Sequence, residues 1–320
     1  MKDVFIQGVD QGCSPIVLGT SLFTPQRKDA VFKILDKYVE LGGNTIDSSR
    51  IYSGGNSEIV LSMWLKARRN RKNLIIINKG GHHWVDDKGV HYPERSRVRP
   101  EMITQDLMAS LKTMEVDFFD IYLIHRDDPE VPVGELLDAL EGYKNAGYIK
   151  AYGVSNWSTQ RIEKANQYAT DKGYSGIVVN SPSLSLAQIN EPRWIGCTYA
   201  DNEYIKWHEK SQIPVLSWAS QGSGFFSGIS ITKDILKPDL ARVYYNDANV
   251  ERYNRAHQLA KQKGEQFTAT NIALAYVLNQ QFPICAVIGP KKVEELVASF
   301  HTIDVQLSSE ERLWLNLQLD

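Results

Sequence analysis

The chain has 320 residues, of which 42% are apolar and 23% charged, a composition typical of a globular protein with a large core. Its 36 Lys and Arg against 38 Asp and Glu give a net charge of −2, which argues against a dedicated binder of nucleic acid or anionic membranes. Its three cysteines, Cys13, Cys197 and Cys285, are too few and too widely spaced for a disulfide framework or a cysteine-ligated zinc site.

The sequence also carries no apolar segment typical of export or membrane insertion. The first residues are too polar for a signal peptide, and the long uncharged stretch at 211–232 contains six serines and two glutamines. We therefore expect a cytoplasmic protein without nucleic-acid or membrane partners, and the sequence leaves open whether it is a monomer or a homo-oligomer.

Eight short apolar runs recur along the chain, each continuously apolar rather than alternating, as expected of parallel strands buried on both faces. They lie at 16–20, 44–49, 74–80, 119–125, 149–156, 176–182, 214–220 and 284–289. Stretches with helical periodicity lie between them, at 27–41, 101–114, 133–146 and 161–169. A turn at 54–56 should precede a further helix, capped at Ser57 with Glu58 in its first turn.

Eight β-then-α units without a linker favour a (β/α)8 TIM barrel that forms one domain over residues 1–320, with an open doubly wound sheet as the alternative. Two segments are longer than a barrel connection requires: 82–99 after the third strand and 183–211 after the sixth. Both follow strands, so they should lie on the face where barrels build active sites.

Four polar residues lie at the ends of the early runs, where a barrel would gather them. Asp47 ends the second run, Lys79 ends the third and His125 ends the fourth, whereas Tyr52 follows Asp47 by five residues. These types suit proton transfer to a carbonyl oxygen. A tyrosine with an ordinary pKa near ~10 is a reluctant donor, a nearby ammonium lowers that pKa, and a carboxylate holds the ammonium in place. The histidine would orient the substrate oxygen.

With these residues in place, the sequence resembles the aldo-keto reductases over essentially its whole length. The matching motifs are NTIDSSRIYSGGNSE (44–58), IIINKG (75–80), FFDIYLIHRDD (118–128), GVSNW (153–157) and IGPKK (288–292). The resemblance implies a (β/α)8 barrel that transfers hydride from NADPH to an aldehyde, ketone or sugar-like carbonyl. It assigns Tyr52 as the general acid, Lys79 and Asp47 as the residues that tune it, and His125 as the residue that orients the substrate.

The resemblance also implies a cofactor site along the second half of the chain. Ser155 and Asn156 would hold the nicotinamide carboxamide together with Ser181, and Trp218 would stack on the nicotinamide ring. The remaining implied residues wrap the pyrophosphate or grip the adenosine 2′-phosphate: Gln221, Gly222, Ser223, Gly289, Lys291 and Lys292.

The sequence departs from the family pattern at three places. Ser181 stands where a glutamine is common, and the loop after the seventh strand reads WASQGSGFF. Glu294 and Glu295 stand where an arginine often follows the phosphate lysines, and an inward carboxylate there would repel a 2′-phosphate. NADP is therefore the expected cofactor, with NAD as the alternative.

Two further groups of residues need an interpretation. His82, His83 and His91 match no metal-ligand spacing, so we expect no metal site. Trp84 in the first long segment and Trp194 and Trp207 in the second would offer aromatic faces to a sugar or an aromatic aldehyde. Two rival functions share the motifs: an NAD-preferring dehydrogenase of the same fold, and a cofactor-binding regulatory subunit with little turnover, like the family's channel-associated β subunits.

Overall fold

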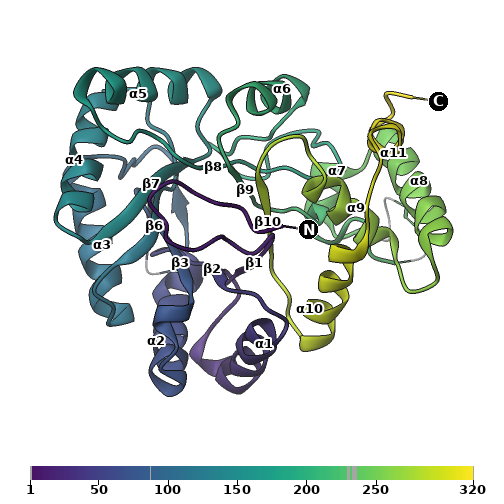
Figure 1. Ribbon diagram of the computed structural model, residues 1–320, viewed down its shortest axis with the longest axis horizontal. Helices are drawn as coiled ribbons and strands as arrows, with labels where there is room; N and C mark the ends of the chain where they lie inside the picture. Colours follow the sequence, from purple (N-terminus) through teal and green to yellow (C-terminus); the bar gives the residue numbers. More distant parts are fainter. Residues whose placement is uncertain (1, 87, 229–230, 233–235, 320) are drawn as a thin grey trace.

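The computed structural model describes residues 2–86, 88–228, 231–232 and 236–319. Within these residues eight parallel strands close into a barrel (Figure 1), in the order β1-β10-β9-β8-β7-β6-β3-β2. The strands are β1 (Ile16–Gly19), β2 (Thr45–Asp47), β3 (Ile75–Gly80), β6 (Phe119–Ile124), β7 (Ile149–Ser155), β8 (Asn180–Ser181), β9 (Val215–Ser217) and β10 (Ile284–Ile288). Each lies inside one predicted apolar run. The (β/α)8 prediction is therefore confirmed, and the open-sheet alternative is wrong.

Helices follow the strands and cover the outside of the barrel (Figure 1). They are α1 (Lys28–Glu40), α2 (Asn56–Arg68), α3 (Pro100–Met114), α4 (Val133–Asn145), α5 (Thr159–Lys172), α6 (Asn202–Ser211), α7 (Pro238–Tyr244), α8 (Asp247–Lys263), α9 (Ala269–Leu278), α10 (Val293–Phe300) and α11 (Ser309–Leu315). The four stretches of helical periodicity correspond to α1, α3, α4 and α5. None of the helices in the described ranges is both long enough and apolar enough to cross a bilayer.

The start of α2 differs from the prediction. The helix begins at Asn56 after the left-handed Gly55, and no side chain caps its first turn. Ser57 lies inside the helix, where its hydroxyl donates to Thr20 Oγ1 over 2.6 Å, so its predicted role as the cap is wrong. Glu58 is in the first turn as expected, but it is fully buried and pairs with Arg50.

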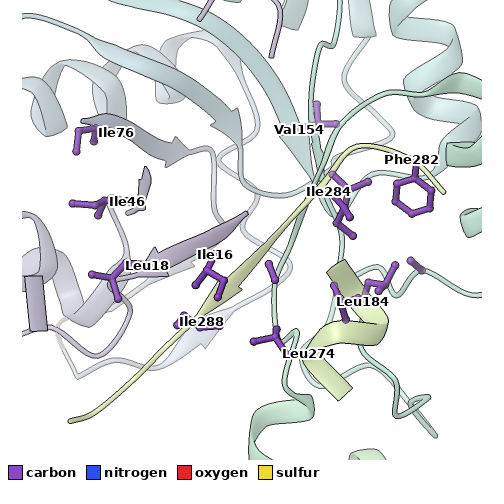
Figure 2. Close-up of a cluster of buried hydrophobic side chains, with 14 of the residues drawn as sticks. Ile16, Leu18, Ile46, Ile76, Val154, Leu184, Leu274, Phe282, Ile284 and Ile288 are labelled. Atoms are coloured by element: carbon purple, nitrogen blue, oxygen red, sulfur yellow. The ribbon is translucent and has the colours of Figure 1, made fainter. Parts of the chain in front are cut away.

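Two apolar clusters explain why the strands are apolar on both faces. Side chains alternate along a strand, so neighbouring residues point to opposite sides of the sheet. Ile16, Leu18, Ile46 and Ile76 belong to the large cluster between sheet and helices (Figure 2). The smaller cluster fills the barrel interior and includes Val17, Ile75, Ile77, Ile121, Leu123, Leu216 and Cys285.

The same alternation decides where the polar residues at the strand ends point. Lys79 follows the interior residues Ile75 and Ile77 at steps of two, and His125 follows Ile121 and Leu123 in the same way. Asp47 is one residue from the outward Ile46 and therefore also faces inward. The carboxyl ends of the strands thus direct these side chains into the mouth of the barrel, where TIM barrels place their active sites.

Three long segments border this mouth. The segment after β3 folds into a small hairpin of β4 (Trp84–Val85) and β5 (His91–Tyr92), and the segment after β8 runs to α6. These are the two long segments predicted from the sequence. A third, between β9 and β10, contains α7, α8 and α9 and was missed. The helix α8 is mostly polar and α9 is apolar and buried almost all round, so neither shows a clear amphipathic period. One domain over the whole chain stays a prediction.

Candidate active site

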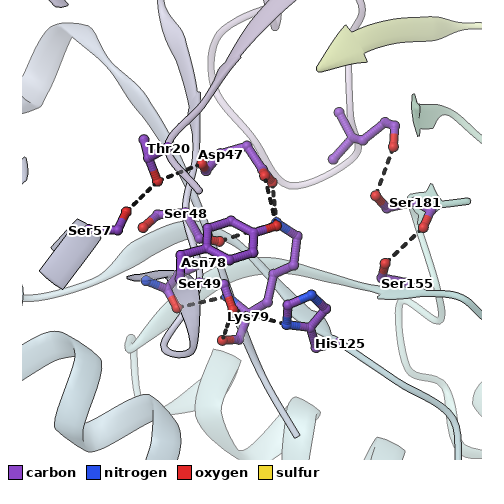
Figure 3. Close-up of polar contacts among 12 residues, drawn as sticks. Thr20, Asp47, Ser48, Ser49, Ser57, Asn78, Lys79, His125, Ser155 and Ser181 are labelled. Carbon is purple, nitrogen blue, oxygen red and sulfur yellow. Dashed lines mark hydrogen bonds and ion pairs between the residues drawn. The ribbon is translucent and has the colours of Figure 1, made fainter. Parts of the chain in front are cut away.

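Asp47, Lys79 and Tyr52 form a connected polar group at the mouth of the barrel. Figure 3 shows the Asp47 and Lys79 side chains pointing toward each other. The Lys79 ammonium is buried, pairs with the Asp47 carboxylate, and donates to the Tyr52 hydroxyl over 3.0 Å. The Tyr52 hydroxyl donates to the second Asp47 oxygen over 3.4 Å. The long lysine side chain therefore joins β3 to β2 and touches the oxygen from which a proton would leave.

A tight turn places Tyr52 over this pair. Tyr52 opens a 3-10 turn directly after β2, and the next three residues, Ser53, Gly54 and Gly55, all have positive φ, at 50°, 62° and 87°. Glycine adopts this left-handed backbone without the steric cost paid by other residues. The turn reverses the chain quickly enough for the Tyr52 ring to return over Lys79, whose ammonium lies 4.9 Å from the ring centroid.

His125 lies on the other side of Tyr52, with the two ring centroids 5.7 Å apart. Its Nδ1 is 3.0 Å from the hydroxyl of Ser49, which also lies 3.2 Å from the Lys79 carbonyl oxygen (Figure 3). Ser49 has a single proton. When Ser49 donates it to the Lys79 carbonyl oxygen, the Ser49 oxygen accepts from His125 Nδ1–H and Nε2 keeps a lone pair. When the hydroxyl turns its proton toward Nδ1, the neutral imidazole carries its own proton on Nε2. The direction of the Ser49 hydroxyl is therefore coupled to the histidine tautomer, a role that sequence reasoning missed.

Burial controls the protonation of this group. Burial raises the pKa of Tyr52 above its ordinary value, and the opposing effect of Lys79 is smaller. The expected lowering by lysine is present, but the net direction we predicted for Tyr52 is wrong, because removal from water penalises the tyrosinate more. Burial also holds the pKa of His125 well below its ordinary value, with His82 and Arg126 adding to the effect. At neutral pH the site therefore holds a protonated tyrosine and a neutral histidine.

The three candidate carboxamide residues line the next strands. Ser155 is buried and donates to the Ser181 carbonyl oxygen over 2.8 Å, and Ser181 donates to the carbonyl of Leu216 over 2.7 Å (Figure 3). The Asn156 amide donates to the His125 carbonyl oxygen over 3.1 Å, and its oxygen accepts from the backbone N–H of Thr198. Asn156 thus links the catalytic strand to the segment after β8, in addition to any contact it makes with a ligand.

Trp218 follows β9 and faces a small cavity. Ser183, Tyr199 and Cys197 line this cavity together with Trp218. The indole Nε1 of Trp218 is buried and has no hydrogen-bond partner among the described residues. Trp194 of the segment after β8 lies nearby, with the two rings 6.1 Å apart. The flat indole ring of Trp218, with an Nε1–H that has no hydrogen-bond partner among the described residues, fits the nicotinamide contact expected from the resemblance.

The expected pyrophosphate residues form a short turn after Trp218. Gly222 and Ser223 both have positive φ, at 57° and 53°, and the Gln221 amide donates to Ser299 over 3.0 Å. The Ser223 hydroxyl accepts from Arg193, whose guanidinium also pairs with Asp239 over 2.7 Å. Arg193 therefore ties the segment after β8 to this turn, and sequence reasoning did not single it out.

The expected 2′-phosphate residues lie between β10 and α10. Gly289 has open space where a side chain would project, and Lys291 and Lys292 are exposed and form no ion pair with the described residues. The backbone N–H of Lys291 donates to the Glu295 carboxylate over 2.7 Å. Glu295 therefore points toward the lysine loop, which is the orientation that the sequence analysis flagged as unfavourable for a 2′-phosphate.

Comparison with known proteins places this geometry in a family. The model of the aldo/keto reductase family matches residues 15–312. The chain belongs to the aldo/keto reductase family. Members of this family are NAD(P)H-dependent oxidoreductases, so the chain is an enzyme of that class. The resemblance inferred from the five motifs is confirmed.

Relatives among characterised proteins share about a quarter of the sequence. The norsolorinic acid reductase stcV of Emericella nidulans is 27% identical, over 93% of this chain and 76% of its own length. The aldo-keto reductase yakc [NADP(+)] of Schizosaccharomyces pombe is 28% identical, over 90% of this chain and 82% of its own length. Aryl-alcohol dehydrogenase [NADP(+)] of Phanerodontia chrysosporium is 24% identical, over 90% of this chain and 76% of its own length.

Solved structures confirm the fold. A glycerol dehydrogenase of Gluconobacter oxydans superposes with a TM-score of 0.76 at 22% identity, covering 98% of this chain and 94% of its own. An aldo/keto reductase of Klebsiella pneumoniae in complex with NADP and acetate gives a TM-score of 0.73 at 19% identity, covering 99% and 95%.

Two of the three tryptophans expected near the substrate lie at the barrel mouth. Trp84 is on the β4–β5 hairpin, 5.0 Å from the Tyr92 ring, and Trp194 lies near Trp218. Trp207 lies elsewhere, because it belongs to α6 on the outside of the barrel and donates to Glu163 of α5 over 2.6 Å. The expectation that Trp207 lines the substrate site is therefore wrong, since the second long segment already includes an outer helix.

Arg126 is a further residue at the mouth that the sequence analysis did not use. It directly follows His125, contacts the His125 carbonyl oxygen over 3.3 Å, and has no ion-pair partner among the described residues. Its neighbour Asp127 is occupied by Arg161 over 3.0 Å. The unpaired charge of Arg126 lowers the pKa of His82, His83 and His125, so it helps to keep this part of the site neutral.

Proposed function

We propose that the protein reduces an aldehyde, ketone or sugar-like carbonyl to the alcohol with NADPH, with Tyr52 as the general acid. The observation that carries this proposal is the contact between the Tyr52 hydroxyl and the buried Lys79 ammonium, with neutral His125 beside it. Bound NADPH supplies the hydride to the carbonyl carbon. All other roles belong to side chains of this chain.

The proton path follows from the hydrogen bonds. His125 presents its Nε2–H to the carbonyl oxygen once Ser49 has turned its proton from the Lys79 carbonyl oxygen to Nδ1. The Tyr52 hydroxyl, which now donates to Asp47, rotates to donate its proton to the same oxygen. Lys79 stabilises the tyrosinate that remains, and Asp47 holds Lys79 in place. Positioned acid catalysis of this kind contributes roughly 10²–10⁴ in rate.

The residues on the second half of the barrel fit NADPH. The orphaned Trp218 Nε1 lies beside a cavity, Gly289 leaves space above its backbone, and Lys291 and Lys292 are cations without partners among the described residues. Two relatives carry NADP(+) in their names, and one structural neighbour holds NADP. Ser155, Asn156 and Ser181 would hold the carboxamide, and Gln221, Gly222 and Ser223 the pyrophosphate.

One contact favours a second candidate, an NADH-preferring enzyme of the same chemistry. The Glu295 carboxylate accepts from Lys291 N–H at the place where a 2′-phosphate would otherwise bind. Initial rates with both cofactors separate the two candidates. A regulatory subunit with little turnover is disfavoured by the complete group of Asp47, Tyr52, Lys79 and His125, and measurable steady turnover would exclude it.

The deciding experiment is Tyr52→Phe, assayed against a panel of carbonyl substrates with NADPH consumption as the readout. The variant keeps the ring but loses the proton, so reduction should fall by roughly 10² or more. NADPH should still quench tryptophan fluorescence through Trp218, and Trp218→Ala should remove that part of the quench. Tyr148→Phe, at an exposed position, is the matched control. Near-normal turnover of Tyr52→Phe would remove Tyr52 from the role.

A further inference from the structure

Three histidines of the segment after β3 converge at the mouth of the barrel. His82 and His83 directly follow the end of β3, and His91 begins β5. The hairpin pairs Val85 with His91 and Trp84 with Tyr92, which returns His91 to the side of His83. One ring nitrogen from each histidine lies within 4.8 Å of the other two. Their sequence spacing gave no sign of this, because the hairpin brings them together.

The hydrogen bonds leave nitrogen lone pairs available. The His82 Nδ1 lies 3.0 Å from the His83 carbonyl oxygen, which only accepts, so Nδ1 carries the proton and Nε2 has a free lone pair. A ring N–H bound to a backbone carbonyl is also the usual outer contact of a metal-ligating histidine. His83 Nε2 and His91 Nδ1 lie 2.7 Å apart and share one hydrogen. An ion would replace this hydrogen after a change of tautomer and a small separation of the two rings, because Zn–N bonds of about 2.0–2.1 Å at a tetrahedral angle place the nitrogens about 3.3–3.4 Å apart.

The three rings differ in their exposure. His82 and His83 are buried at the mouth of the barrel. His91 is exposed and provides the route from solvent.

We propose that His82, His83 and His91 form a binding site for a divalent transition metal ion at the edge of the active site. Imidazole nitrogens suit Zn²⁺, Ni²⁺, Cu²⁺ and Co²⁺, whereas Mg²⁺ and Ca²⁺ require oxygen ligands. Three protein ligands leave a fourth tetrahedral position for water. The positive charge of Arg126 opposes every cation, so occupancy requires an ion that binds imidazole strongly.

Metal binding at this place affects the neighbouring catalytic histidine. The His82 and His125 rings lie 4.9 Å apart in an edge-to-face arrangement. A metal ion would fix the β4–β5 hairpin against His125 and place a second positive charge beside the substrate site. We therefore expect occupancy to inhibit carbonyl reduction. This consequence rests on the proposed function, whereas metal binding itself does not.

The binding test uses the full chain, produced without a histidine tag and treated with a chelator. Titration with Co²⁺ should give the visible absorption bands of a tetrahedral ion, and Zn²⁺ should displace it. His91→Gln removes an exposed ligand and should weaken Zn²⁺ binding by at least about tenfold. His301→Gln, which changes an exposed histidine outside the cluster, should bind as the wild type does. Circular dichroism checks that each variant is folded.

Two results would overturn the proposal. Wild-type protein that binds Co²⁺ and Zn²⁺ no more tightly than His91→Gln would show that the three histidines do not act together. Equal weakening by His301→Gln would show general surface binding.

Zn²⁺ should also slow NADPH-dependent reduction. A chelator should relieve this inhibition, His91→Gln should be less inhibited, and Mg²⁺ should have no effect. Tight Zn²⁺ binding without inhibition would overturn only the expected effect on catalysis. Unchanged activity in Tyr52→Phe would overturn the proposed function, and the result on metal binding would still stand.

Discussion

On the side of the barrel mouth formed by β2, β3 and β6, the polar side chains hold one another in buried contacts. Asp47 pairs with Lys79, Lys79 donates to Tyr52, and Ser49 contacts His125. On the side formed by β9, β10 and their loops, the corresponding loop residues contact side chains of α10 instead. Gln221 binds Ser299, and Glu295 accepts from the Lys291 backbone.

The difference matches what the proposed function requires of each side. The catalytic side must keep a tyrosine hydroxyl and a histidine nitrogen in fixed directions, which requires contacts that are complete before a ligand arrives. The cofactor side must admit a long charged molecule and exchange internal contacts for contacts to it. Substitutions on the catalytic side should therefore change both rate and stability, whereas those on the cofactor side should change affinity.

Lys79→Met tests the catalytic side with the largest expected effect. Removing the ammonium leaves the Asp47 carboxylate buried without its partner, so the free energy of unfolding should fall by about 3–5 kcal/mol. Carbonyl reduction should also be severely reduced. Urea unfolding and NADPH consumption measure the two effects, with the exposed Lys72→Met as control.

Adding Asp47→Asn to Lys79→Met sharpens this result. The double variant should regain part of the lost stability, because no unpaired charge remains, but it should not regain activity. If Lys79→Met keeps the full rate of carbonyl reduction and the same pH dependence of that rate, Lys79 does not act on the pKa of Tyr52.

Replacing both Lys291 and Lys292 with alanine tests the cofactor side. Charge-assisted hydrogen bonds contribute roughly 1.5–3 kcal/mol each, so NADPH affinity should fall about ten- to hundredfold per contact while NADH affinity changes little. The unfolding free energy should stay the same, because both lysines are exposed. The selective loss should shrink in high salt.

Glu295→Gln is the matched change, since it removes the negative charge that faces the lysine loop. It should strengthen NADPH binding more than NADH binding. Equal weakening of both cofactors in the double lysine variant would instead place the lysines at the shared pyrophosphate, and no change in either would make them a solvated pair.

The strand that carries Ser181 should respond to acid through His208. His208 is buried, its Nε2 accepts from Asn180 over 3.0 Å, and its Nδ1 donates to the Ile213 carbonyl oxygen over 2.9 Å. Burial lowers its pKa in the folded protein to about 4, below the ordinary 6.5 of the unfolded chain.

Between these two values the unfolded chain binds more protons, so the free energy of unfolding should fall as the pH drops from 6.5 to 4. Protonation of His208 in the unfolded chain should lower the free energy of unfolding by about 2–3 kcal/mol by pH 4. His208→Gln should have a flatter pH profile in this window by urea unfolding, and His301→Gln the wild-type profile. Identical slopes in all three proteins would show that His208 does not carry this effect.

Ser49→Ala is expected to have the smallest effect. It removes the hydroxyl contacts with the Lys79 carbonyl oxygen and with His125 Nδ1. The contact with His125 contributes about 0.5–1.5 kcal/mol, so the reduction rate should fall by up to about tenfold while NADPH affinity stays the same. Ser48→Ala is the control, because the Ser48 hydroxyl is buried but has no partner among the described residues. A shift in the pH dependence of the reduction rate in Ser49→Ala would separate control of the His125 tautomer from simple packing. Equal reduction rates in Ser49→Ala and Ser48→Ala would contradict a role of Ser49 in catalysis.

The sequence by itself determined the barrel and the place in it of the candidate catalytic residues. Eight continuous apolar runs predicted eight strands buried on both faces, and the side-chain period of two sends Asp47, Lys79 and His125 to the same interior mouth. These properties are local: a strand end fixes both the position and the direction of its last side chain. The sequence placed Tyr52 beside them through the glycines of the following turn.

Tertiary structure decided the contacts between segments that lie far apart in the chain. The Ser49 contact to His125, the Arg193 contact to Ser223 and the convergence of His82, His83 and His91 all depend on how loops fold back over the mouth. The net pKa of Tyr52 also depends on burial, which spacing does not reveal. Sequence patterns record the period of a strand or helix, but loops have no period, so their partners are known only when the chain is folded.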